Sequence, residues 1–167
     1  MTTSKPLFIY LQRPDTGTWV TVGRYLRDAD GTGRFRYAPT YLEASLPWSI
    51  DPVNLPLVGG IEHLAYRYQG LHDALRDTCP DAWGRLLLQR EFHLPDSAHD
   101  SDYLRVARNG DRWGALAVGT TRKPSVDVIC SPRLVQLESL AEELLAMYER
   151  RPAVNARMRR MLMATPA

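Results

Sequence analysis

The chain is poor in cysteine, in lysine and in net charge. Its 167 residues include two cysteines, Cys79 and Cys130, and two lysines, Lys5 and Lys123. Two cysteines so far apart predict neither a disulfide framework nor a zinc site and favour reduced thiols in a cytosolic protein. A net charge of +2 is too small to argue for nucleic-acid binding. Because nearly all the positive charge is arginine, two interpretations stay open: a coding bias, or arginines that bind phosphate.

Long apolar runs are also missing. No segment approaches the ~20 apolar residues that a transmembrane helix needs, and no stretch of signal-peptide length follows the N-terminus. We therefore expect a cytoplasmic protein that does not bind membranes. Hydrophobic residues make up 44% of the chain and charged residues 24%, which is typical of a globular domain with its own core.

No motif for nucleotide chemistry is complete. The glycines at 31–33 lack the Lys-Ser/Thr pair of a phosphate loop, so this segment predicts a hairpin turn. Asp111 stands beside an arginine, but in the wrong order for a kinase catalytic loop and without a metal-binding asparagine downstream. We predict that Asp111 is a turn residue, and we expect no catalytic residue in the chain.

Four histidines and Cys79 are the remaining candidates for a metal site or a nucleophile. No two histidines have the one-turn spacing of a helical metal site. Residues 93–100 have two interpretations: a weak metal site at the surface, or a loop whose side chains are simply solvated. Cys79 lies just before a predicted helix, where the helix dipole lowers a thiol pKa, but no partner base can be assigned. We therefore predict a structural cysteine, no resident metal and no cofactor.

The N-terminal part of the chain has the texture of an antiparallel sheet. Strand-forming residues occur at 7–11, 19–22 and 34–37, and the last two runs are separated by a strong turn signal at 28–33. The segment 49–57 contains two prolines, which cannot donate to a strand ladder, so it predicts an edge strand.

Helical patterns follow the sheet. Apolar spacing predicts a helix at 63–76, or only from about Leu71, since Gly70 weakens the middle. A second helix is predicted at 82–91, capped by Asp81, and a short one ends at Ala107. A further buried strand is expected at 114–121.

The C-terminal part is expected to be helical throughout. A long helix is predicted from Ser131, its N-cap, to Tyr148, and a short helix follows in the tail. The fold class is therefore α+β, with a small N-terminal antiparallel β-sheet packed with several short helices, then a C-terminal helical segment. We divide it into a domain at 7–121 and a helical tail at 131–167.

The tail carries arginines around a methionine-rich face that includes Met158 and Met161. One interpretation is an amphipathic segment that touches lipid or RNA. The other is a helix that packs against a partner, which the adaptable methionine face favours.

Four segments together resemble the N-terminal region of HipA-type serine/threonine kinases, the toxins of bacterial toxin–antitoxin systems. They keep the family's order and spacing, although Ala82 stands where glycine is common. The segments are Arg36–Leu42, Ile50–Leu57, Leu71–Gly84 with its Cys-Pro-Asp-Ala-Trp-Gly end, and Asp102–Leu116.

The resemblance implies a kinase-associated protein without the kinase chemistry. Full-length members bind ATP with Mg²⁺, phosphorylate serine or threonine on a protein, and are restrained by a DNA-binding, HipB-like antitoxin. Their Gly-rich loop, catalytic aspartate and metal-binding aspartate come after this region, and no position of this chain matches them. We therefore expect no kinase activity and a chain that ends near the start of the kinase core.

Three functions follow as hypotheses. The first is a non-catalytic regulatory module that binds a HipA/HipT-like kinase core or a HipB-like antitoxin; its contact candidates are Trp83, Trp113, Met158 and Met161. For each tryptophan, a place in the core is the competing interpretation. The second is a truncated remnant of a full-length kinase. The third is an arginine-rich RNA-binding protein, although direct nucleic-acid binding is not what the net charge favours.

Overall fold

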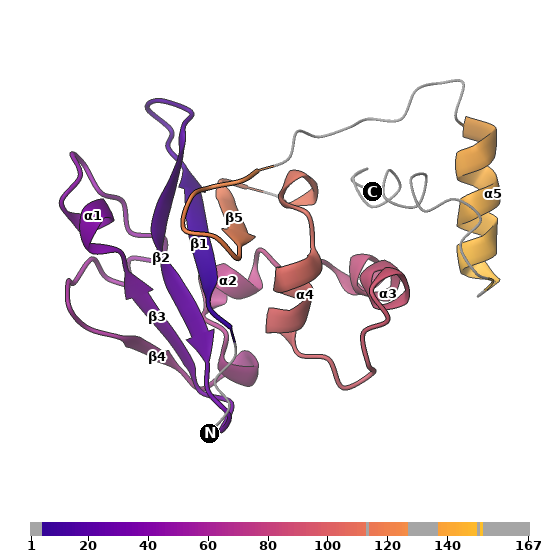
Figure 1. Ribbon diagram of the computed structural model, residues 1–167, viewed down its shortest axis with the longest axis horizontal. Helices are drawn as coiled ribbons and strands as arrows, with labels where there is room; N and C mark the ends of the chain where they lie inside the picture. Colours follow the sequence, from indigo (N-terminus) through magenta and orange to yellow (C-terminus); the bar gives the residue numbers. More distant parts are fainter. Residues whose placement is uncertain (1–4, 113, 127–136, 150, 152–167) are drawn as a thin grey trace.

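A computed structural model describes residues 5–112, 114–126, 137–149 and 151. Its centre is a five-stranded antiparallel sheet in the order β4-β3-β2-β1-β5, as predicted for the N-terminal part. Figure 1 shows the sheet with β2 in its middle, between β3 and β1. The strands are β1 Leu7–Gln12, β2 Trp19–Arg27, β3 Gly33–Tyr37, β4 His63–Ala65 and β5 Leu116–Gly119.

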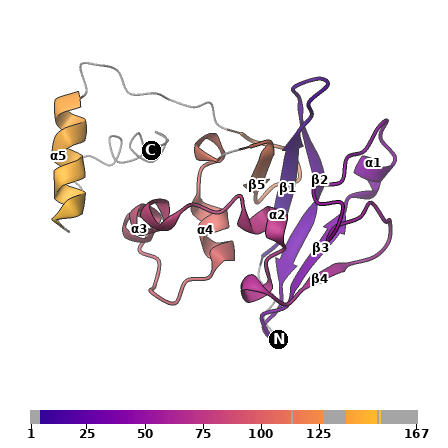
Figure 2. The ribbon, with the colours of Figure 1, turned by 180° about the vertical axis from the view of Figure 1, so that it is seen from behind.

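Helices lie beside one face of this sheet, and the expected α+β class is confirmed. Figures 1 and 2 show α2 and α4 next to the sheet, with α3 beyond α4 and α5 farther out. None of the labelled helices covers the opposite face, which we call the open face. Part of this face is crossed by the segment after β5, where the carbonyl oxygens of Thr121 and Arg122 accept hydrogen bonds from the hydroxyls of Tyr10 and Thr21. The helices are α1 Pro39–Leu42, η1 Tyr68–Gly70, α2 Asp73–Arg76, α3 Ala82–Glu91, α4 Asp100–Val106, η2 Asn109–Asp111 and α5 Leu137–Tyr148.

The hydrophobic core lies between the sheet and the helices. Strand residues alternate between the two faces, so every second side chain of β1 and β3 points toward the core. In β2 an irregular register near Gly23 interrupts the alternation, so Val22 and Tyr25 both face the core. Burial of a large apolar side chain contributes about 1.5–3 kcal/mol, which makes this layer the main source of stability. Its fully buried members include Leu7, Ile9, Val22, Tyr25, Phe35, Tyr37, Leu75, Leu104 and Val118.

The edge strand lies later in the chain than the sequence predicts. Residues 49–57 form a turn with a single bridge between Asp51 and Leu55, and β4 at His63–Ala65 pairs with β3 instead. The helix predicted from His63 is therefore wrong over its first ten residues, whereas the alternative start near Leu71 lies two residues before α2. The chain turns sharply at Tyr68 and Gln69, which have φ values of 49° and 58°, and a helix cannot continue through left-handed residues.

Other predicted elements are confirmed. Helix α3 spans Ala82–Glu91, and the Asp81 carboxylate caps it by accepting a hydrogen bond from the Gly84 amide at 2.7 Å. Strand β5 lies within the strand expected at 114–121. Helix α5 lies within the helix expected from Ser131 to Tyr148, whereas the predicted tail helix lies outside the described residues.

Membrane-crossing helices do not occur in the described part of the chain. None of its helices combines the length and the apolar character that a bilayer span requires.

Candidate partner-binding surface

Trp83 lies at the surface, in the first turn of α3. Its side chain is 41% exposed, and Leu86, one turn later, is 39% exposed. The same helix turns Leu87 and Leu88 into the interior. Helix α3 therefore separates a buried leucine side from a side that presents an indole ring to solvent. The role of Trp83 as a partner contact stays a prediction.

The close contact between position 84 and Pro80 explains why glycine follows Trp83 at the start of α3. A Cβ on Gly84 would stand 2.9 Å from the Cβ of Pro80, so only glycine lets the first turn of α3 pack against the proline before it. The Arg85 guanidinium donates to the Pro80 carbonyl at 3.0 Å. These contacts hold Trp83 on a fixed helix start.

An ion pair joins α3 to α4. Arg85 pairs with Asp100 at the start of α4, and its guanidinium lies 5.4 Å from the ring centroid of Tyr103. Because the Asp100 carboxylate is at a helix N-terminus, the helix dipole also stabilises it. The pair fixes the direction in which α3 presents Trp83.

A hydrogen bond joins α5 to α3, and α5 also exposes apolar side chains. Arg90 donates to the Met147 carbonyl oxygen at 2.7 Å. Exposed apolar residues on α5 are Leu144, Leu145 and Tyr148. Two neighbouring helices thus each carry apolar surface that the described residues leave uncovered.

Arg112, in the segment around residues 102–116 that resembles the family, makes structural contacts. Arg112 donates to three backbone carbonyl oxygens, those of Thr78 at 2.7 Å, Leu104 at 2.8 Å and Ala107 at 3.1 Å. Its Nε donates to the Asn109 carboxamide oxygen at 2.9 Å. Arg112 therefore ties the end of α4 to the loop before α3. Sequence inspection missed it, because its partners are main-chain oxygens that leave no residue signature.

Asp111 ends the short helix η2, in a turn as predicted. Asn109 begins the same turn, and its carboxamide oxygen also accepts a hydrogen bond from the Val118 amide at 2.8 Å. The turn therefore supports β5 from the side.

Cys79 is a poor nucleophile. Burial raises the pKa of its thiol to about 12, and the nearby Asp100 carboxylate adds to the rise. The sulfur lies 3.8 Å from the Leu75 carbonyl oxygen, a weak contact. A thiol with this pKa is protonated at neutral pH and lacks the reactivity of a catalytic thiolate.

The histidines do not gather at one site. His63 and His72 are buried in the core, where the His72 Nε2 lies 3.1 Å from the His63 carbonyl oxygen. His99 occupies the N-cap position of α4, and its Nδ1 lies 3.0 Å from the Gln69 side-chain oxygen. Within the ranges that the structure describes, no three His, Cys, Asp or Glu side chains are placed to hold a metal ion.

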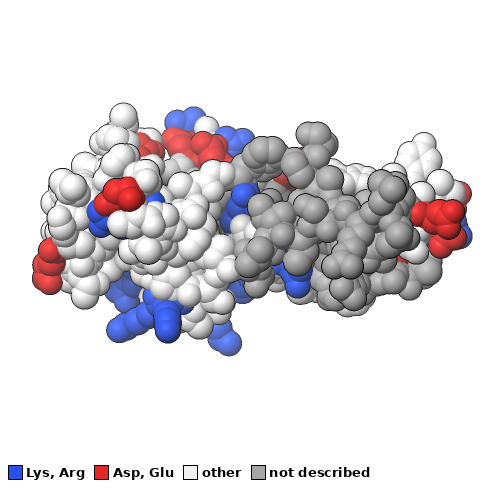
Figure 3. Space-filling model, turned by 90° about the horizontal axis from the view of Figure 1, so that it is seen from above, with Lys and Arg blue, Asp and Glu red and all other residues white. Residues whose placement is uncertain are grey.

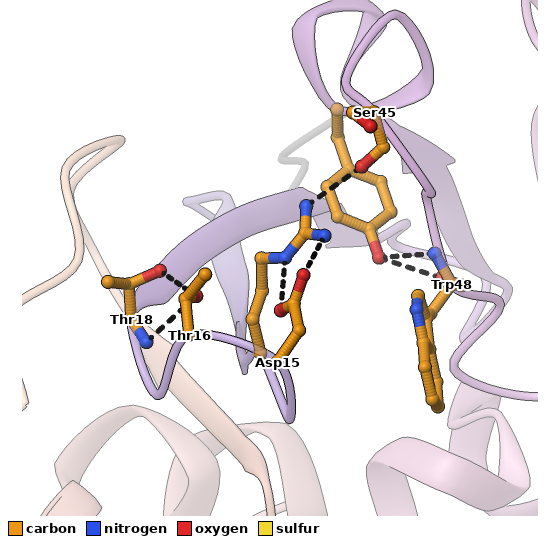
Figure 4. A network of polar contacts seen from close by, with 7 residues as sticks. Asp15, Thr16, Thr18, Ser45 and Trp48 are labelled. Atoms are coloured by element: carbon orange, nitrogen blue, oxygen red, sulfur yellow. Dashed lines mark hydrogen bonds and ion pairs between the residues drawn. The ribbon is translucent and has the colours of Figure 1, made fainter.

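A second exposed tryptophan, Trp48, was missed in the sequence. Its backbone is held at both ends by the Tyr41 hydroxyl, which accepts from the Trp48 amide and donates to the Trp48 carbonyl, both at 2.8 Å (Figure 4). Arg13 pairs with Asp15 at 2.6 Å and donates to the Ser45 carbonyl at 3.0 Å. The ring of Trp48 is nevertheless 53% exposed. In the sequence Trp48 follows a proline in a predicted loop, and no local pattern indicates that Tyr41 holds this loop by two hydrogen bonds.

The other candidate contacts cannot be placed. Trp113, Met158 and Met161 lie outside the residues that the structure describes. Their proposed roles therefore rest on the sequence alone.

Comparison with known proteins identifies the domain. The model of the HipA N-terminal domain matches residues 18–119, from the start of β2 to the end of β5. A search of curated proteins finds no match. Because the family match spans more than half of the 167 residues, the chain belongs to the HipA N-terminal domain family, which is associated with toxin–antitoxin systems.

Proposed function

We propose that this chain is a non-catalytic regulatory module that binds a separately encoded HipA-type kinase core. The observation that supports the proposal best is the half-exposed Trp83 on a rigid helix start. A HipB-like antitoxin is the second protein partner to test.

Trp83 has the physical properties of an interface anchor. Tryptophan is enriched among residues whose removal costs about 2 kcal/mol or more of binding energy. The Asp81 cap and the Arg85–Asp100 ion pair already fix α3. Binding through Trp83 therefore loses little conformational entropy, which favours affinity.

The non-catalytic part of the proposal is supported by where the family match lies. Residues 18–119 match the N-terminal domain, whereas the phosphoryl-transfer residues of the family belong to the kinase core. Phosphoryl transfer needs a phosphate cradle, a metal and a nucleophile held together. We expect no ATP hydrolysis and no autophosphorylation by the purified chain; turnover above a no-protein control would contradict this.

Co-purification with the products of neighbouring genes tests the binding role. We expect a stable complex with wild-type protein and a loss of at least about tenfold in affinity for Trp83→Ala, which corresponds to about 1.4 kcal/mol. Trp48→Ala is the matched control, since it removes another exposed tryptophan from a different surface. Equal binding by Trp83→Ala and wild type, or no complex at all, would rule the proposal out.

The remnant of a full-length kinase is the competing proposal. The exposed apolar residues of α5, Leu144, Leu145 and Tyr148, fit a helix that once packed against a kinase core as well as one that packs on a separate partner. The DNA downstream decides between them. A separate kinase reading frame supports the module, and kinase sequence in another frame without its own start supports the remnant.

A further inference from the structure

Two arginines lie side by side on the open face of the sheet. Arg24 of β2 and Arg36 of β3 are direct cross-strand partners, and both point away from the core because their neighbours Tyr25, Phe35 and Tyr37 point into it. No carboxylate of the described residues forms an ion pair with either. In Figure 3, basic side chains gather along the lower edge of the molecule, toward which the open face is turned.

Apolar side chains lie beside this pair. Phe8 of β1 lies opposite Arg24, and the neighbouring row across the sheet contains Leu26, Arg34 and Leu64. Arg34, unlike the other two, is neutralised by Asp28 at 2.5 Å and Glu62 at 3.2 Å. On the open face, Arg34 thus forms ion pairs with carboxylates of the same chain, whereas Arg24 and Arg36 form none with the described residues.

Two like charges directly opposite each other on a sheet destabilise it. A partner that brings two carboxylates to Arg24 and Arg36 would remove this repulsion. The mixture of arginine with leucine and phenylalanine is typical of a protein interface, whereas nucleic-acid interfaces are more polar and more strongly basic.

Helix α5 carries the complementary pattern. Glu138, Glu142, Leu145 and Tyr148 follow one another at helical spacing and form one exposed stripe. Leu145 is 56% exposed and Tyr148 is 84% exposed. The opposite side of α5 buries Leu140 and Met147.

The two carboxylates are also without partners. Neither Glu138 nor Glu142 forms an ion pair with a described residue. Because they lie four residues apart, their mutual repulsion destabilises the helix. Their Cβ atoms are about 6 Å apart in a helix, close to the roughly 5 Å between cross-strand neighbours such as Arg24 and Arg36.

We infer that the α5 stripe of a second copy of this chain docks on the open face of the sheet. Glu138 and Glu142 pair with Arg24 and Arg36, and Leu145 and Tyr148 cover the apolar side chains beside them. The chain's own α5 is joined to α3 by the hydrogen bond from Arg90 to the Met147 carbonyl oxygen, and it lies at the end of the molecule far from the sheet (Figures 1 and 2). A second copy therefore supplies the helix, and the reciprocal contact closes the pair with two-fold symmetry.

This inference is independent of the proposed function. It uses the open face and the outer stripe of α5, whereas the kinase-binding proposal uses Trp83 on α3. A Trp83→Ala variant that loses the kinase but keeps its self-association separates the two.

Charge reversal on each surface tests the contact. Sedimentation of the full-length chain at low salt should show a concentration-dependent dimer that weakens as salt rises. Arg24→Glu/Arg36→Glu and Glu138→Arg/Glu142→Arg should each remain monomeric at concentrations about tenfold above the wild-type midpoint, because each places like charges across both contacts. A mixture of the two variants should dimerise again, since both contacts then join opposite charges.

Several results would overturn the inference. These are a monomeric wild type at all concentrations, a dimer that persists in both variants, and a mixture that fails to associate although both variants keep a wild-type circular dichroism spectrum and melting transition. Arg108→Glu, an exposed reversal elsewhere, should leave the dimer intact; loss of the dimer there would show a net-charge effect. Binding of single-stranded RNA lost in Arg24→Glu/Arg36→Glu, without self-association of the wild type, would assign the face to nucleic acid instead.

Discussion

Gly33 and Gly70 lie backbone against backbone. A Cβ on Gly33 would stand 1.6 Å from the carbonyl oxygen of Gly70, and a Cβ on Gly70 would stand 2.8 Å from the Gly33 nitrogen. The Tyr25 hydroxyl donates to the same Gly70 carbonyl at 2.9 Å. The start of β3 is thus fastened to η1, and this contact brings the following helices to the sheet.

Gly33→Ala should therefore be severely destabilising. The added methyl group meets a carbonyl of the main chain, which no side-chain rotation can relieve, so we expect a loss of more than about 3 kcal/mol in the free energy of unfolding. Urea denaturation measures it. Gly17→Ala is the control, because Gly17 has a positive φ of 67° but open space around it. Its cost should be about 1–2 kcal/mol, and equal losses at the two sites would contradict the steric explanation.

The same contact shows where sequence reasoning stops. Strands β1 to β3 and helix α3 were predictable, because alternation, turn glycines and the Asp81 cap are local signals. Residues 63–76 also carry a local signal, the helical spacing of Leu64, Tyr68, Leu71 and Leu75, yet most of this segment is strand and turn. The approach of Gly70 to Gly33, 37 residues earlier in the numbering, overrides that spacing, and no local pattern records it.

The candidate surfaces also include one feature that the sequence indicates and others that depend on the fold. Trp83 stands out in the sequence because Trp-Gly at a helix start is unusual. The clamp on Trp48 and the pairing of Arg24 with Arg36 depend on a tyrosine in another element and on strand register. Register becomes known only once the strands are paired, so these features could be found only in the structure.

Tyr41→Phe should cost more stability than Trp48→Ala. The Tyr41 hydroxyl makes two backbone hydrogen bonds to Trp48, and its removal leaves both groups without that partner, at a cost of about 1–3 kcal/mol. The Trp48 ring is largely exposed, so its truncation should stay within about 1 kcal/mol. Thermal or urea unfolding of both variants tests the order; the reverse order would show that the ring, and not the clamp, stabilises the loop.

Cys79 should resist thiol reagents in the folded protein. Burial first, and the Asp100 carboxylate second, raise the pKa of this thiol to about 12, so the reactive thiolate is scarce at pH 8. Labelling with iodoacetamide followed by mass spectrometry should leave Cys79 unmodified in native protein and modify it in urea. Cys79→Ser should keep any partner binding. Rapid native labelling at Cys79 would contradict the raised pKa of its thiol.

His72 should make the fold less stable in mildly acidic solution. Burial lowers the pKa of His72 below its usual value of 6.5, although its contact with the His63 carbonyl and the charges of Asp51 and Asp73 oppose the shift. The unfolded chain therefore binds a proton at a higher pH than the folded chain. Stability is fully present above about pH 6.5 and falls as the pH drops toward the lower folded-state pKa. Burial also lowers the pKa of His63, which adds to the same trend.

His72→Gln isolates this effect. The glutamine amide can still donate to the His63 carbonyl oxygen, as the His72 Nε2 is placed to do at 3.1 Å, but it does not titrate. Urea midpoints between about pH 7.5 and 5.5 should fall for wild type and fall less for His72→Gln, because His63 still titrates. Equal slopes for the two proteins would mean that His72 has the same pKa in the folded and unfolded chains. A rise in wild-type stability on acidification would reverse the sign and show that its folded-state pKa is raised.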